Sequence, residues 1–373
     1  SPGGYVAPTR LGRHKAKVCP AGFTPKAPAE GKNTGCEVEA QKRTFNLHRP
    51  AKTFSGPRPV MVYFHGTGGS AGEIASYQKS WRDLLVKNGW IVAGPQGELN
   101  GTMWPEWDAM RAKSDLARKN KDVLFFDKLV DCVAGHYQVD EKRIFVSGLS
   151  AGGIMSNRIL RSRSTLVAGG VVGSGVWDFT DPPKDVPLGD MAVMVTWGGD
   201  NDEYSGSSGG KTVPKINFAE QAAFASSAYE KAAKVNQVHC KGDNVGHRWL
   251  NVVEDVMLDF LLANPKGLSK NPHWKLKAPK AGAKVTCSED AAKYVPKVTV
   301  TCKKNTNADC LVYCQSIADC VVENGSVAPI LGNEITALGF TGTNYGECKG
   351  CITACEADAK KGGAVDDAVL ACY

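Results

Sequence analysis

A short stretch at residues 143–154 limits the folds open to this chain more than any other part of the sequence. It reads Arg-Ile-Phe-Val-Ser-Gly-Leu-Ser-Ala-Gly-Gly-Ile, an apolar run of strand-like composition followed at once by residues compatible with a helix. Gly148 and Gly152 flank Ser150, and glycines relieve the crowding of a sharp strand-to-helix turn. We expect the Ser150 hydroxyl to stand above a sheet edge, over a helix N-terminus whose free N–H groups stabilise a negative oxygen.

Apolar runs typical of buried strands alternate with helical patterns along the chain. The predicted strands are residues 59–64, 90–93, 144–147, 166–172, 192–196 and 237–240, and the predicted helices are 71–87, 123–137, 153–160, 218–233 and 252–263. Strands that are apolar on both faces are typical of a parallel sheet covered by helices on both sides. We therefore predict an α/β fold, in which the loops that follow the strands share the ligand-binding edge.

Composition divides the 373 residues into four segments. Residues 1–57 form an arm rich in Pro, Gly and Lys, with an edge strand near 43–48. The α/β domain covers residues 58–264, a basic linker covers 265–284, and a cysteine-rich module of helical composition covers 285–373. A chain of this length can bury a full core in one large domain and carry a smaller one.

Nine of the thirteen cysteines lie between Cys287 and Cys372, which indicates a disulfide framework made in an oxidising compartment. Zinc competes as an explanation for Cys348 and Cys351, but no histidine lies in this segment. The suggested pairs are Cys19 with Cys36, Cys310 with Cys355, and Cys314 with Cys351. An odd number leaves at least one cysteine over, and Cys132, inside a predicted buried helix, is the candidate. We expect a secreted protein.

The formal net charge of +7 is a mild excess, and the lysines are scattered rather than gathered in a stripe with aromatic residues. This pattern argues against a nucleic-acid partner. No apolar run reaches the roughly 18 to 20 residues that cross a bilayer, so no membrane span is predicted. The chain begins Ser-Pro-Gly-Gly without an initiator Met, which suggests either that a leader was removed or that the first residues are an expression scar.

A nucleophilic serine needs a base, and the base needs an acid that orients it. Six of the seven histidines lie in the N-terminal arm, in the linker, within predicted elements, or in a Gly-rich turn that His65 is expected to shape. His247 remains, in a loop between the last predicted strand and the last predicted helix. It is the candidate base.

The acid is expected after the strand at 192–196, where Asp200 and Asp202 compete. A calcium loop is a third reading of Asp-x-Asp, but the remaining ligands of such a loop are missing. The Gly-rich turn at 65–69 follows an early strand and lacks the lysine of a phosphate-binding loop. It can aim a backbone N–H at the same point as the N–H of Ala151. These parts, each at a strand end, predict serine hydrolase chemistry without a metal or organic cofactor.

Three motifs resemble the polyhydroxybutyrate depolymerase and feruloyl esterase family of secreted α/β-hydrolases. They are His-Gly-Thr-Gly-Gly-Ser at 65–70, the segment 139–153 around Ser150, and Gly-His-x-Trp at 246–249. The resemblance covers about residues 59–263. It implies an α/β-hydrolase fold with Ser150 as nucleophile and His247 as base.

The same resemblance implies that the N–H groups of Thr67 and Ala151 form the oxyanion hole, and it favours Asp202 over Asp200 as the acid. The family usually has His-Gly-x-x-Asp at the acid, and Trp197 stands here in place of that His. Leu250 replaces the proline that commonly follows the tryptophan of the base motif.

Four tryptophans fall in or near loops expected to face the site, and they are Trp104, Trp107, Trp177 and Trp249. They are candidates for stacking on sugars or aromatic acids, although large loop residues more often serve packing. The resemblance implies hydrolysis of feruloyl or acetyl esters of polysaccharide, or of a polyester such as polyhydroxybutyrate. The substrate is then a small-molecule or polymeric ester, and the C-terminal module is a candidate attachment to an insoluble polymer. The rivals are a peptidase of the same fold and a non-catalytic binding protein that uses this module.

Overall fold

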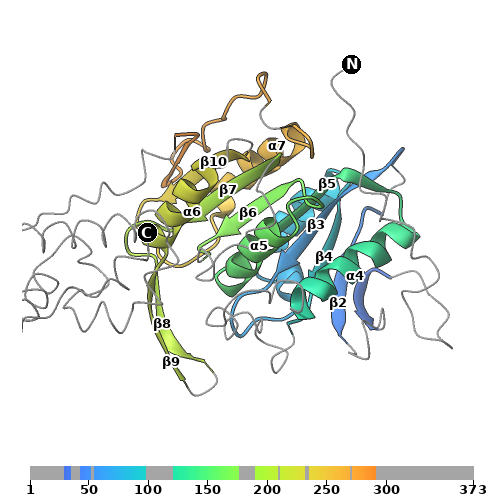
Figure 1. Ribbon diagram of the computed structural model, residues 1–373, viewed down its shortest axis with the longest axis horizontal. Helices are drawn as coiled ribbons and strands as arrows, with labels where there is room; N and C mark the ends of the chain where they lie inside the picture. The colour runs from blue at the N-terminus through green and yellow to red at the C-terminus, as the bar shows by residue number, and fades with distance from the viewer. Residues whose placement is uncertain are drawn as a thin grey trace, which may run out of the picture.

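The computed structural model of the chain describes residues 29–34, 43–51, 54–97, 121–175, 190–208, 211–231, 235–268 and 271–290 (Figure 1). These residues form a sheet of nine strands with helices on both faces, and a separate two-stranded hairpin. The predicted α/β fold is therefore confirmed. The helical character predicted for the C-terminal module lies outside the described residues.

The strands of the sheet follow the order β1, β2, β4, β3, β5, β6, β7, β10 and β11. The six central strands, from β4 to β10, run parallel to one another. Antiparallel pairing adds β2 and then β1 at one edge and β11 at the other. The strands are β1 (Gly31–Thr34), β2 (Thr44–His48), β3 (Arg58–Phe64), β4 (Ile91–Pro95), β5 (Val139–Leu149), β6 (Gly169–Gly173), β7 (Met191–Trp197), β10 (Val235–Gly242) and β11 (Val285–Ser288).

Strand β3 shows why helices cover both faces. Successive side chains of a strand point to opposite faces, and those of β3 are apolar on both. Val60 and Val62 join a core with α4, α5 and α6, whereas Met61 and Tyr63 join a second core with α1 and α7. The helices are η1 (Glu73–Ala75), α1 (Lys79–Lys87), α4 (Lys121–His136), α5 (Ala151–Ser162), α6 (Phe218–Lys231), η2 (Asn251–Val253) and α7 (Glu254–Ala263). No helix in the described part of the chain is long and apolar enough to cross a bilayer.

The sheet reaches beyond the predicted segment 58–264, because β1, β2 and β11 belong to its edges. Four-residue edge strands such as β1 and β11 carry too little periodicity to be seen in the sequence. The hairpin of β8 (Glu203–Ser208) and β9 (Lys211–Asn217) was also not predicted. It follows the acidic loop after β7 and extends away from the sheet (Figure 1).

The described residues of the predicted basic linker, 265–284, lie against α7. The Trp274 indole N–H donates a hydrogen bond to Asp259 at 2.7 Å, and its ring packs against the second core. Lys280 pairs with Asp255 at 3.0 Å, so acidic side chains of α7 face the basic charge of this segment. This segment of linker-like composition therefore packs on the α/β domain.

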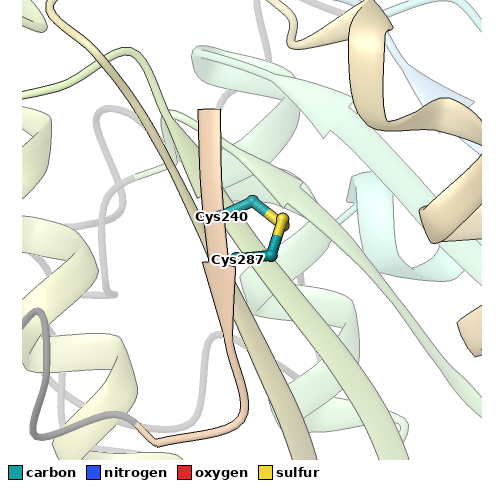
Figure 2. Close-up of a disulfide and its surroundings, with 2 residues drawn as sticks. All are labelled: Cys240 and Cys287. Atoms are coloured by element: carbon teal, nitrogen blue, oxygen red, sulfur yellow. A yellow bond between two sulfur atoms is a disulfide. The ribbon is translucent and has the colours of Figure 1, made fainter. Parts of the chain in front are cut away.

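A disulfide between Cys240 and Cys287 joins β10 to the edge strand β11 (Figure 2). Cys132 is also disulfide-bonded, so the prediction that it stays free is wrong. Cys132 is buried as the sequence predicts, at 2% exposed, but burial does not distinguish a free thiol from a disulfide. The other suggested pairs lie outside the described residues.

Candidate active site

Ser150 occupies the turn between β5 and α5 with φ 59° and ψ −123°. This backbone is costly for a residue with a side chain, and such strain gathers at functional sites. The flanking glycines make the turn possible, because strand β3 passes close to it. A Cβ added at Gly148 would lie 2.6 Å from the Phe64 carbonyl oxygen, and one added at Gly152 would lie 1.9 Å from it. Only glycine fits at either position.

The backbone around Ser150 is held from two sides. Its N–H donates to the Gly173 carbonyl at 2.9 Å, and its carbonyl accepts from Ile154 in the first turn of α5. Ala151 opens that helix, and N–H groups in the first turn have no partner within the helix. The positive end of the helix dipole therefore lies directly beside the Ser150 side chain.

The Gly-rich turn after β3 is held by His65 and Glu73. His65 Nδ1 bonds the Gly66 carbonyl at 2.8 Å, and Nε2 accepts from the Gly97 N–H at 3.0 Å, so this histidine shapes the turn as predicted. Burial lowers the pKa of His65 to about 4, which keeps it neutral. The Glu73 carboxylate accepts hydrogen bonds from the Gly66 N–H at 3.1 Å and the Tyr63 hydroxyl at 2.7 Å.

This turn also lies against the serine turn. A Cβ added at Gly66 would be 3.8 Å from the Ser150 Cβ. Thr67, the next residue, has a buried hydroxyl without a hydrogen-bond partner among the described residues. The segments that carry Thr67 and Ala151 therefore meet at Ser150.

His247 is paired with Asp202 rather than with Asp200. Its Nδ1 lies 2.8 Å from Asp202 Oδ1, and the Asp202 side chain is fully buried. Asp202 Oδ2 accepts further hydrogen bonds from the Gly198 N–H at 2.7 Å and the Ser174 hydroxyl at 2.6 Å. Asp200 is 72% exposed and pairs with a lysine on β10. The arrangement directs the remaining ring nitrogen of His247, Nε2, away from the carboxylate.

Aromatic rings flank His247. Phe218 stacks on the imidazole with ring centroids 4.6 Å apart, and Tyr204 is tilted against it at 6.3 Å.

The Ser150 hydroxyl has no hydrogen-bond partner within the described part of the chain. In a ligand-free active site the hydrogen bond between nucleophile and base is often long and tightens when substrate binds.

Trp249, which the sequence predicts to face the site, is largely buried. It is 7% exposed, and its ring lies 6.2 Å from Tyr63 and 6.2 Å from Trp81, in the core beneath the sheet edge. The indole N–H donates to Glu254 at 3.0 Å. The structure therefore places Trp249 in the second core rather than on an exposed loop surface. Trp104, Trp107 and Trp177 lie outside the described residues.

Glu254 is a buried carboxyl next to this core, with Ser80 as its second hydrogen-bond donor at 2.9 Å. Burial raises the pKa of Glu254 from 4.5 to about 7. Between about pH 4.5 and about pH 7, Glu254 therefore keeps a proton in the folded chain that it releases in the unfolded chain. This contribution to stability is complete below about pH 4.5 and is lost as the pH rises through about 7.

We therefore expect Glu254→Gln to raise Tm more at pH 8 than at pH 5, and the two gains should differ by about 3 °C or more. The reason is that glutamine keeps the accepting oxygen but carries no buried charge at pH 8. Thermal unfolding at the two pH values measures the difference. Asp255→Asn is the matched control, since Asp255 is 58% exposed, and its change is expected to be small at both. An equal gain for Glu254→Gln at both pH values would contradict the assignment.

Sequence reasoning missed Glu73, Phe218 and Ser174. Glu73 and Phe218 carry no local motif, since their roles depend on contacts made by distant segments. Ser174 had one available signal, a hydroxyl residue directly after the end of a parallel strand. Among the described residues, no group of three or more His, Cys, Asp or Glu side chains is placed to hold a metal ion.

Comparison with known proteins finds similar sequences and similar solved structures. The sequence model of the prolyl oligopeptidase family matches residues 82–213. An oxidized polyvinyl alcohol hydrolase from Pseudomonas sp is 29% identical over 71% of this chain and 83% of its own length. A second, from Sphingopyxis sp. (strain 113P3), is 29% identical over 74% of this chain and 90% of its own. Acetylxylan esterase A from Aspergillus oryzae is 25% identical over 35% of this chain and 41% of its own.

A crystal structure of native sOPH superimposes with a TM-score of 0.59 at 25% identity, covering 72% of this chain and 96% of that one. Native pOPH gives a TM-score of 0.58 at 24% identity, covering 72% and 96%. The predicted α/β-hydrolase fold is confirmed, and the chain is an esterase-like hydrolase of the α/β-hydrolase superfamily.

Proposed function

We propose that this chain is a secreted serine esterase that hydrolyses a carboxylic ester through an acyl-enzyme on Ser150. One observation carries the proposal: the 2.8 Å hydrogen bond between His247 and the buried Asp202, on a loop of the same sheet edge as a serine in a strained turn. An imidazole held by a buried carboxylate is the base that a serine nucleophile requires.

The reaction follows from the groups on this edge. His247 Nε2 takes the hydroxyl proton as Ser150 Oγ attacks the ester carbonyl, and the Asp202 carboxylate stabilises the imidazolium. The N–H groups of Thr67 and Ala151 donate hydrogen bonds to the tetrahedral oxyanion. His247 then protonates the departing alcohol. Water activated by His247 releases the acid and restores Ser150.

The substrate class we propose is an acetyl or feruloyl ester of a polysaccharide, or a polyester such as polyhydroxybutyrate. Acetylxylan esterases among the relatives support the acetyl ester of a polysaccharide. The Cys240–Cys287 disulfide supports an oxidising, extracytoplasmic location. Attachment to an insoluble polymer remains our proposal for residues 285–373.

The second candidate function is cleavage of oxidised polyvinyl alcohol. It is supported by the two oxidized polyvinyl alcohol hydrolases, which match most of this chain. Polyvinyl alcohol is a 1,3-polyol, so its oxidation yields 1,3-diketones. Attack by Ser150 on one ketone would break the bond between that carbonyl carbon and the carbon between the two ketones. The attacked carbonyl stays on Ser150 as an acyl group, and the other fragment leaves as an enolate, which His247 protonates. The same acyl-enzyme and the same oxyanion donors would serve this reaction.

A substrate panel distinguishes these candidates. Wild-type chain and Ser150→Ala are incubated with acetylated xylan, methyl ferulate, polyhydroxybutyrate film, oxidised polyvinyl alcohol and a chromogenic peptide amide. We expect the wild type to release acid from at least one ester, and the variant to release none above background. Cleavage of oxidised polyvinyl alcohol without ester hydrolysis would favour the second candidate. Cleavage of the peptide alone would overturn both.

A further inference from the structure

We propose that Ser174 is a positioning residue that holds Asp202 in the orientation His247 needs, an inference that rests on the function proposed above. Ser174 directly follows β6 and is 1% exposed. Its hydroxyl donates a hydrogen bond of 2.6 Å to Asp202 Oδ2, the carboxylate oxygen that does not face His247.

The hydrogen bonds of Asp202 explain how Ser174 acts. Oδ2 accepts from both the Ser174 hydroxyl and the Gly198 N–H, while Oδ1 faces His247 Nδ1. Rotation of the carboxylate would therefore break two charge-assisted hydrogen bonds. Asp202 is 0% exposed, so bulk water does not replace a lost donor. Without the Ser174 hydroxyl, the Gly198 N–H is the one donor to this oxygen that remains among the described residues.

The backbone of Ser174 gives independent support. Its φ of 40° lies in the left-handed region, which glycine adopts more easily than serine. The Ser174 N–H donates to the Thr196 carbonyl at 2.7 Å, which fixes this conformation between β6 and β7. A glycine here would relieve strain but would lack the hydroxyl. The strained serine therefore supplies a hydrogen-bond donor that glycine could not.

Two adjacent residues consequently hold two parts of the site. The Gly173 carbonyl accepts the Ser150 N–H at 2.9 Å, and the Ser174 hydroxyl holds Asp202. The end of β6 thus fixes the nucleophile's backbone and the acid relative to each other. A shift of about 1 Å in such a distance can lower a rate about 100-fold.

The test uses Ser174→Ala, which removes the hydroxyl, and Ser174→Gly, which removes it and also relieves the strain. We expect both to lower kcat on a chromogenic ester about 10- to 100-fold with KM changed by less than about threefold. Ser174→Gly is expected to melt at or above the temperature of Ser174→Ala. Ser162→Ala is the control, because it removes a buried hydroxyl bonded to a backbone carbonyl at the far end of α5. Its kcat should stay at the wild-type value.

A spectroscopic readout separates positioning from general stability. The proton shared by His247 and Asp202 is expected to give a downfield proton resonance, assigned by its loss in His247→Gln. We expect this resonance to shift or broaden in both Ser174 variants and to stay unchanged in Ser162→Ala. Wild-type kcat and an unchanged resonance in Ser174→Gly would overturn the inference while leaving the proposed function intact. Activity that persists in Ser150→Ala would instead overturn the proposed function.

Discussion

Replacing Ser150 with alanine is expected to lower kcat for a chromogenic ester by roughly 10⁶-fold, because the variant lacks the hydroxyl that forms the acyl-enzyme. Initial rates on purified protein measure the loss, and thermal unfolding checks that the fold is intact. Alanine keeps the positive φ of 59° at the turn, so stability should change little.

Ser156→Ala provides a matched control for this variant. Ser156 is also buried and lies in α5, six residues after Ser150, and its hydroxyl donates a hydrogen bond to the Gly152 carbonyl at 2.8 Å. Its kcat should remain within about threefold of the wild type, since most substitutions away from reacting groups act on stability instead. Equal losses in the two variants would mean that the helix, rather than the Ser150 hydroxyl, is what activity depends on.

The second large effect is expected at Asp202. Asp202→Asn should lower kcat roughly 10⁴-fold, because an amide can hold the imidazole in the tautomer that cannot accept the serine proton. Asp200→Asn should change kcat less than about threefold, since Asp200 is 72% exposed and its pair with Lys241 lies at the surface. Steady-state kinetics of both variants measures the contrast. A larger loss in the Asp200 variant would transfer the role of the acid to that residue.

Much of the parallel sheet was predictable because its strands are apolar on both faces. The β3 run from Arg58 to Phe64 and the β7 run from Met191 to Trp197 stand out in the sequence for that reason. The positions of Asp202 and His247 were predictable for the same reason, because both residues follow parallel strands and the loops after such strands lie at one edge of the sheet. The hydrogen bond that selects Asp202 over Asp200 required coordinates, since the two differ by two residues in one loop.

Other features depend on contacts that no local pattern encodes. Trp249 lies in a segment that the sequence predicts to be a loop, but its ring packs against Tyr63 and Trp81 from distant segments. The β8–β9 hairpin is rich in Gly and Ser, so its pairing carries no periodic signal. The place of Ser174 after a strand is visible in the sequence, but its partner, Asp202, is not. Sequence periodicity therefore predicts the parallel sheet, whereas the residues that contact the predicted site residues can be identified only from tertiary packing.

The central claim is that Ser150 is an activated nucleophile, and covalent labelling tests it most directly. Wild-type chain and Ser150→Ala are treated with a fluorophosphonate probe, and the adduct is located by mass spectrometry of peptides. We predict one adduct per chain, on the peptide that carries Ser150, and none on this peptide in the variant. A wild-type chain that is active on esters but forms no adduct, or an adduct on another residue that persists in Ser150→Ala, would contradict the claim.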